Sequence, residues 1–178
     1  MRTTRVHTAV VLSALAVVAV VVLRCAWVSD DAFITLRTVH NALSGYGLRF
    51  NPAERVQAYT HPLWMALLLV AHAAVGSPWY AAAGLGGLVT LVGLAALAFP
   101  PTPDGERTEG AAAALALFVD AKALVDYATS GLENPLTHLL LALFAWLLFQ
   151  GGDRPADLFR TALLTALAML NRLDLAVL

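Results

Sequence analysis

Two adjacent carboxylates, Asp30 and Asp31, follow a long apolar segment of the chain. That segment, over residues 8–28, is long enough to cross a bilayer. A carboxylate at the end of a membrane span can act as the general base toward a hydroxyl group, and two neighbouring carboxylates can divide the work. The alternative is that one aspartate only caps a helix beginning at Ala32, which stabilises a helix by about 1 kcal/mol.

The composition places the chain in a membrane, since 60% of its 178 residues are hydrophobic and only 13% are charged. Soluble domains carry about 25% charged residues. The net charge of −1 leaves no basic surface for nucleic acid. The single cysteine, Cys25, excludes an intrachain disulfide and a cysteine-based metal cluster.

Arg2 and Arg5 precede the first apolar run and predict a retained signal anchor with a cytoplasmic N-terminus, rather than a cleaved signal peptide. We therefore expect Asp30 and Asp31 to lie on the extracytoplasmic side of a cell membrane that the chain crosses several times.

The apolar segments predict an all-α fold, a polytopic transmembrane helical bundle. Spans are expected over residues 8–28, 62–76, 79–99, 134–150 and 158–178. The second and third spans are expected to form a tight hairpin. Residues 32–43 predict an interfacial amphipathic helix in the first extracytoplasmic loop, ended by Gly45 and Gly47.

The segment over residues 111–129 is expected to be broken or re-entrant, because Asp120 lies near its centre. A charge there costs roughly 2.5–3.5 kcal/mol on insertion scales. If this segment dips into the membrane without crossing it, Glu133 lies on the same outer side as Asp30 and Asp31; if it crosses, the assignments that follow invert.

Three segments of the chain carry a family resemblance. The first extends over residues 29–64, from Ser-Asp-Asp-Ala-Phe-Ile to Tyr-Thr-His-Pro-Leu-Trp. The second is Ser-Gly-Leu-Glu at 130–133 and the third is Asn-Arg-Leu-Asp at 171–174. Together they resemble GT-C glycosyltransferases of the kind represented by actinobacterial terminal β-(1→2) arabinofuranosyltransferases. Ala53 and Leu173 depart from the family pattern, which often has glycine and proline there, and Gln57 replaces a frequent acid.

The resemblance implies an inverting enzyme that moves a sugar, such as arabinofuranose, from a polyprenyl-phosphate donor to a cell-envelope glycan outside the cytoplasm. It implies membrane lipid as a further partner, and Asp30 or Asp31 as the general base. Family members are several times longer, so the chain is expected to be the N-terminal part of such an enzyme. Some GT-C enzymes resemble metal-dependent catalysts, which leaves a divalent cation open as a cofactor, with His61 either its ligand or a hydrogen-bonded helix cap.

Further polar and aromatic residues are candidates for binding substrate, each with a structural alternative. Arg37 lies about two helical turns beyond the aspartates and could bind a lipid phosphate or membrane headgroups. Glu54 and Arg55 could bind the acceptor or pair with each other. Tyr59 could stack on sugar or belong to the interfacial aromatic belt, and Glu133 could face the site or cap a helix.

Trp64 has the same two interpretations as Tyr59, and an interfacial anchor is the favoured one for it. Two other functions stay open for the whole chain. One is a transporter or lipid-binding membrane subunit that uses Asp120 and Lys122 as its polar site. The other is a non-catalytic, truncated relic of the enzyme.

Overall fold

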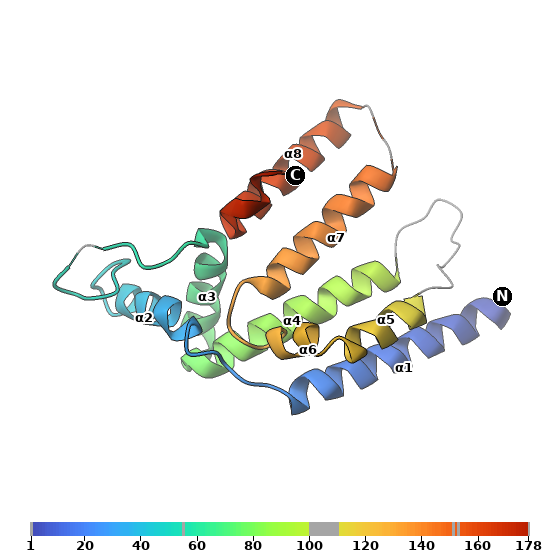
Figure 1. Cartoon of the computed structure of the whole chain (residues 1–178), viewed down its shortest axis with the longest axis horizontal. Helices are drawn as coiled ribbons and strands as arrows, with labels where there is room; N and C mark the ends of the chain where they lie inside the picture. The colour runs from blue at the N-terminus through green and yellow to red at the C-terminus, as the bar shows by residue number, and fades with distance from the viewer. Residues whose placement is uncertain (1, 55, 100–110, 151, 153, 178) are drawn as a thin grey trace.

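The computed structural model describes residues 2–54, 56–99, 111–150, 152 and 154–177. These residues form helices and no strands, which confirms the predicted all-α class. The helices are α1 (Arg2–Arg24), α2 (Ala32–Leu43), α3 (Pro62–Val75), α4 (Pro78–Ala98), α5 (Ala111–Asp120), α6 (Lys122–Tyr127), α7 (Asn134–Gln150) and α8 (Pro155–Asn171), followed by the 3₁₀ helix η1 (Leu173–Val177) (Figure 1).

The central element is α4, which packs against α1 and α5 in one part of the molecule and against α3 and α7 in another. Two apolar cores therefore meet along it. The first contains Val11, Val18, Val22, Leu94, Ala98, Ala111, Leu115, Phe118, Val125 and Ala128. The second contains Ala32, Leu36, Val39, Trp64, Met65, Leu68, Ala82, Leu136, Leu140 and Ala168. A Cβ atom on Gly86 of α4 would lie 2.6 Å from the carbonyl oxygen of Ala128, so glycine permits the close approach of α6.

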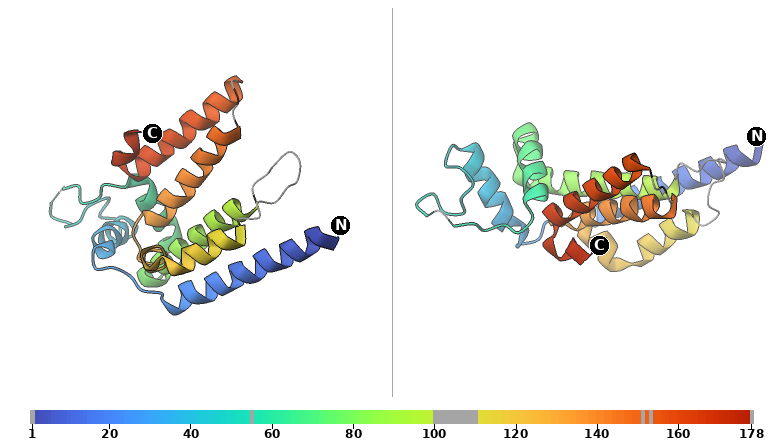
Figure 2. Two further views of the ribbon diagram at one scale, coloured as in Figure 1. Left: turned by 45° about the vertical axis from the view of Figure 1, so that its right-hand side comes forward. Right: turned by 90° about the horizontal axis from the view of Figure 1, so that it is seen from above.

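Helices α2 and α3 lie at one end of the molecule, away from the start of α1 (Figure 2). Both views show α3 standing across the direction of α4, which differs from the tight hairpin expected for these two segments. The short connection explains the turn. Gly76 ends α3 in the left-handed conformation, with φ 77°, and Pro78 starts α4.

The helix expected over residues 32–43 is present, and the two glycines beyond it have φ values of 85° and 79°. Its buried face includes three polar residues, Thr35, Thr38 and Asn41. Asn41 donates from Nδ2 to the carbonyl oxygens of Arg49 and Phe50, at 2.8 and 2.9 Å, and so fastens the following loop. The interfacial position of α2 stays a prediction.

The helix between residues 111 and 127 is interrupted at Ala121, which separates α5 from α6. Lys122 forms an ion pair with Asp126 one turn further along α6. Asp120 is exposed at the end of α5.

One helix among the described residues, α4, is long and apolar enough to cross a membrane. Shorter apolar helices cover Thr8–Arg24, Pro62–Val75 and Asn134–Gln150. A span needs about 20 residues. The polytopic arrangement therefore stays a prediction.

Candidate functional site

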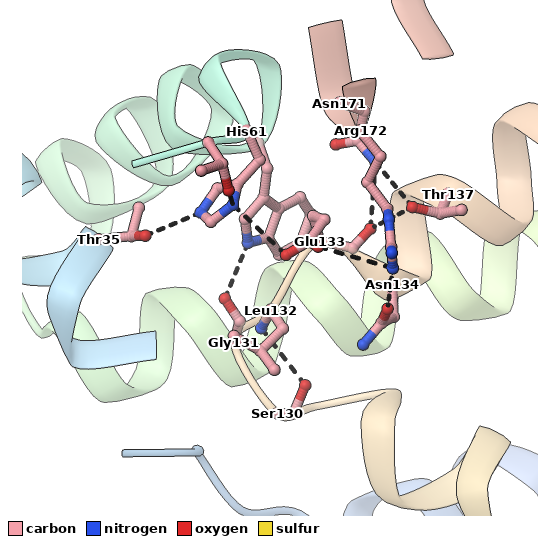
Figure 3. Close-up of polar contacts among 12 residues, drawn as sticks. Thr35, His61, Ser130, Gly131, Leu132, Glu133, Asn134, Thr137, Asn171 and Arg172 are labelled. Atoms are coloured by element: carbon pink, nitrogen blue, oxygen red, sulfur yellow. Dashed lines mark hydrogen bonds and ion pairs between the residues drawn. The ribbon is translucent and has the colours of Figure 1, made fainter. Parts of the chain in front are cut away.

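The three segments that carry the family resemblance meet around Glu133, which lies just before α7 (Figure 3). The side chain of Glu133 is 17% exposed. Its Oε2 lies 3.5 Å from Nδ1 of His61, at the start of α3, and its Oε1 lies 3.8 Å from Nη1 of Arg172, just beyond α8. The carboxylate is thus placed between an imidazole and a guanidinium from two other elements.

His61 also contacts Thr35 of α2, whose Oγ1 lies 2.8 Å from Nε2 of the imidazole. Burial lowers the pKa of His61 and outweighs the nearby Glu133 carboxylate, which raises it. The lowered pKa favours the neutral ring at pH 7. When the Thr35 hydroxyl donates to Nε2, the ring proton is on Nδ1, on the side of Glu133.

Thr35, His61 and Glu133 follow the hydroxyl–imidazole–carboxylate order of a nucleophilic triad. Thr35 is only 3% exposed, however. A hydroxyl buried to this extent cannot meet a substrate, so it orients the imidazole instead of attacking.

Arg172 is held mainly by Asp174. Its Nε and Nη2 donate to the two carboxylate oxygens of Asp174 at 3.1 and 2.8 Å, a bidentate arrangement. Its Nη1 donates to Oδ1 of Asn134 at 3.4 Å. Arg172 therefore gives Glu133 a nearby positive charge through an additional, longer contact.

The backbone before Glu133 is fixed by Gly131. Its φ of 81° favours glycine, and an added Cβ atom would lie 2.8 Å from Cβ of Ala32. The backbone N–H of Ser29 donates to the carbonyl oxygen of Ser130 at 2.8 Å. This loop is thus packed directly on the start of α2, beside the two aspartates.

Trp64 donates from Nε1 to the carbonyl oxygen of Gly131 at 2.8 Å and is 0% exposed. Both interpretations of Trp64 were wrong, because a fully buried indole neither anchors at a membrane interface nor stacks on a sugar. Its N–H explains the burial, since a buried indole needs an acceptor and the left-handed loop supplies one.

Asn171 holds the loop from the other side. Its Nδ2 donates to the carbonyl oxygen of Glu133 at 3.3 Å and to Oγ1 of Thr137 at 2.9 Å. Thr137 in turn donates to the same carbonyl at 3.1 Å. The end of α8 is therefore hydrogen-bonded to the start of α7.

Asp30 and Asp31 are exposed. Oδ1 of Asp30 accepts hydrogen bonds from Oγ of Ser29 at 3.2 Å and from the backbone N–H of Asp31 at 3.0 Å. Asp31 precedes α2 and makes no side-chain capping bond. Asp30 also lines an open groove of about 400 Å³. The other residues lining it are Phe33, Ile34, Leu36, Arg37, His40, Phe50 and Pro78.

Arg37 fastens the loop that follows α2. Its Nε donates to the carbonyl oxygen of Phe50 at 2.9 Å and its Nη2 to Oδ1 of Asn51 at 3.3 Å. The guanidinium carbon lies 4.6 Å from the centre of the Phe50 ring, a cation–π contact. Arg37 thus has a structural role in this loop, while it also lines the groove next to Asp30.

The remaining candidates lie further along this loop. Glu54 is exposed and accepts a hydrogen bond from Nδ2 of Asn51 at 3.4 Å. Tyr59 is half-buried and packs against the second core. Arg55 lies outside the described residues, so its expected roles are not addressed by the structure. Within the described part of the chain, no hydrogen bond or ion pair joins Glu54 or Tyr59 to Glu133.

No group of three or more histidine, cysteine, aspartate or glutamate side chains is placed to hold a metal ion among the described residues. His61, the candidate ligand, contacts Thr35 and Glu133 instead.

Sequence reasoning did not select Thr35, Asn171 or Arg172 as site residues, and it considered His61 only as a metal ligand or a helix cap. The sequence did offer one indication of their role, because each of them lies in one of the three segments that carry the family resemblance. Their partners are remote in sequence and could be found only from the fold.

Sequence comparison relates the chain to two proteins named terminal β-(1→2)-arabinofuranosyltransferase. The one from Mycobacterium tuberculosis is 36% identical over 131 residues, which cover 68% of this chain and 21% of that protein. The one from Corynebacterium glutamicum is 58% identical over 38 residues, or 21% of this chain and 6% of that protein. The predicted resemblance is confirmed, and the chain spans about a fifth of the length of the first relative.

No protein-family model matches the chain. No solved structure matches it either.

Proposed function

We propose that this chain, a relative of the terminal β-(1→2)-arabinofuranosyltransferases, is the N-terminal part of a membrane glycosyltransferase of the GT-C type. The reaction is the transfer of arabinofuranose from a polyprenyl-phosphate donor to a cell-envelope glycan outside the cytoplasm. The observation that carries the proposal is the meeting of all three resembling segments at Glu133, where His61 and Arg172 contact its two carboxylate oxygens.

In the proposed reaction, Asp30 or Asp31 accepts the proton of the acceptor hydroxyl. The hydroxyl oxygen attacks the anomeric carbon as the bond to the polyprenyl phosphate breaks, so the configuration at that carbon inverts. The phosphate leaves with the bonding electron pair and needs a cation or hydrogen-bond donors to stabilise its charge. Exposed carboxylates suit the role of base, because the acceptor must reach them.

The groove beside Asp30 supports this assignment. Most of its lining is apolar, while Asp30, Arg37 and His40 supply polar groups. A lipid-linked sugar requires such a combination of an apolar surface and nearby polar groups. We assign Arg37 to the phosphate, and Glu133, with Glu54, Arg55 and Tyr59, to sugar binding.

The test is sugar transfer from a polyprenyl-phosphate arabinofuranose donor by Asp30→Asn, Asp31→Asn and the double variant in the full-length protein. Loss of a general base lowers the rate by about 10²–10⁴-fold. We expect that loss in at least one single variant, with membrane insertion retained. Asp157→Asn, which alters a carboxylate paired with Arg154 and Arg160, is the control and should keep full activity. Normal transfer by the double variant would refute the assignment.

The transporter alternative has less support. It requires Asp120 and Lys122 to form a polar site, but Lys122 is 86% exposed and pairs with Asp126. An exposed pair one helical turn apart is an ordinary surface feature of a helix.

A further inference from the structure

His61 contacts Glu133 directly but has no part in the chemistry proposed above. We propose that His61 is a positioning residue, which donates from Nδ1 to Oε2 of Glu133 while Thr35 fixes the opposite side of its ring. The inference rests on the proposed function, because it assumes that Glu133 binds the sugar during transfer.

The position of the imidazole is set by Thr35. The hydroxyl of this buried threonine lies 2.8 Å from Nε2, well within hydrogen-bonding distance. A buried hydroxyl without a partner is costly, so the contact stabilises both groups. As a result the ring of His61 is held against α2 by a hydrogen bond, and its Nδ1 faces the Glu133 carboxylate.

The rotation of the Glu133 carboxylate is the degree of freedom that His61 controls. Asn171 and Thr137 hold the main-chain carbonyl of Glu133 but do not touch its carboxylate. Arg172 is 3.8 Å from Oε1 and is already engaged by both oxygens of Asp174. Among the described residues, the side chain that can fix the carboxylate on its second oxygen is therefore His61, whose Nδ1 lies 3.5 Å from Oε2 and also 3.4 Å from the Thr60 hydroxyl.

Two substitutions separate this role from a purely structural one. In His61→Asn the amide nitrogen takes approximately the place of Nδ1 and keeps a donor toward Glu133. In His61→Gln the amide oxygen takes approximately the place of Nε2 and keeps an acceptor for the Thr35 hydroxyl. Both amides are neutral donors at every pH used.

We expect His61→Asn to retain sugar transfer within about threefold, and His61→Gln to lose roughly 100-fold, the cost of a misplaced binding group. The assay uses decaprenyl-phosphoryl arabinofuranose and a synthetic arabinofuranosyl acceptor with the full-length protein. Any other ranking overturns the proposal, whether the two variants are equal or the glutamine variant is the more active.

A second measurement does not depend on activity. Nitrogen NMR of labelled histidine should show the His61 ring with its proton on Nδ1 at neutral pH. Glu133→Gln should lower the pKa of His61, because the carboxylate that raises it is removed. Thr35→Val should weaken the preference for the proton on Nδ1, because Nε2 loses its donor while the Glu133 carboxylate still accepts from Nδ1. Thr38→Val, which removes a buried α2 hydroxyl that donates to the carbonyl oxygen of Ile34, is the control and should change neither property.

An unchanged pKa and tautomer of His61 in Glu133→Gln would overturn the proposed contact. If the NMR changes occur but Glu133→Gln transfers sugar normally, the contact holds and the role of Glu133 in transfer is refuted. The two measurements thus distinguish failure of the positioning role from failure of the proposed function.

Discussion

Glu133 and Asp30 are both acids within resembling segments, but their surroundings differ. Glu133 is mostly buried and has a guanidinium and an imidazole within 4 Å. Asp30 is exposed and accepts hydrogen bonds from Ser29 and the backbone of Asp31. A buried carboxylate needs such compensation, whereas an exposed one can exchange a proton with substrate. This difference supports assigning binding to Glu133 and proton abstraction to Asp30 or its neighbour.

The lowered pKa of His61 predicts a dependence of stability on pH. An unfolded histidine titrates at about 6.5. In the folded protein the value is lower, so the unfolded state binds more protons between the two values and stability rises with pH there. The contribution of His61 is complete above about pH 6.5 and is lost as the pH falls from that value through the folded pKa.

We therefore expect the wild-type protein to lose more unfolding free energy than His61→Asn on acidification from about pH 7.5 to 5.5, since the substituted amide does not titrate. Denaturant unfolding in detergent micelles at several pH values measures the difference. Parallel pH profiles for the two proteins would contradict the prediction.

At the level of elements, the packing of the 130–133 loop on α2 depends on Gly131. Gly131→Ala adds a left-handed alanine, which costs about 1–2 kcal/mol, and a Cβ atom 2.8 Å from Cβ of Ala32. Overpacking adds typically 1–3 kcal/mol. Gly45→Ala is a matched control, because Gly45 has a φ of 85° and nothing within 4 Å of the added atom. Thermal unfolding should therefore show a larger loss for Gly131→Ala, and equal losses would show that the contact is unimportant.

The elements differ in how far the sequence predicted them. The helix over 32–43 and the interruption near Asp120 follow from local features, namely glycines that end a helix and a charge that breaks an apolar run. The burial of Trp64 could not be predicted locally, because its acceptor, the carbonyl of Gly131, is 67 residues away. The contacts of His61 with Thr35 and Glu133 could not be predicted either, because these residues are also far apart in the sequence. The three segments could be recognised from sequence, but their meeting point required the fold.

For the whole molecule, the figures show which ends of the helices lie together. The end of α1, the start of α7 and the end of α8 lie toward the end of the molecule that holds α2 and α3 (Figures 1 and 2). The end of α4 and the start of α5 lie at the opposite end, with the start of α1. Glu133 and the aspartates thus share an end, as in the sequence-based topology in which residues 111–129 are re-entrant. In that topology, however, two spans over 62–76 and 79–99 put the end of α4 on the outer side.

In one arrangement α4 alone crosses the membrane after α2, and in the other residues 62–76 and 79–99 both cross it. The two arrangements place Thr102, which follows α4 in the sequence, on opposite sides of the membrane. Single cysteines at Ser44, Thr102 and Ala156, in a Cys25→Ser background, would be treated with a membrane-impermeant maleimide in intact cells. If Asp30 and Asp31 face outward, Ser44→Cys reacts at once, because Ser44 lies in the exposed loop after α2. Ala156→Cys, in the first turn of α8, reacts only after the membrane is opened. We expect Thr102→Cys, like Ala156→Cys, to react only after the membrane is opened, since α4 is then the single helix that crosses the membrane between Ser44 and Thr102. Immediate reaction of Thr102→Cys would instead support the hairpin of two spans, and would require α3 to turn alongside α4 in the membrane.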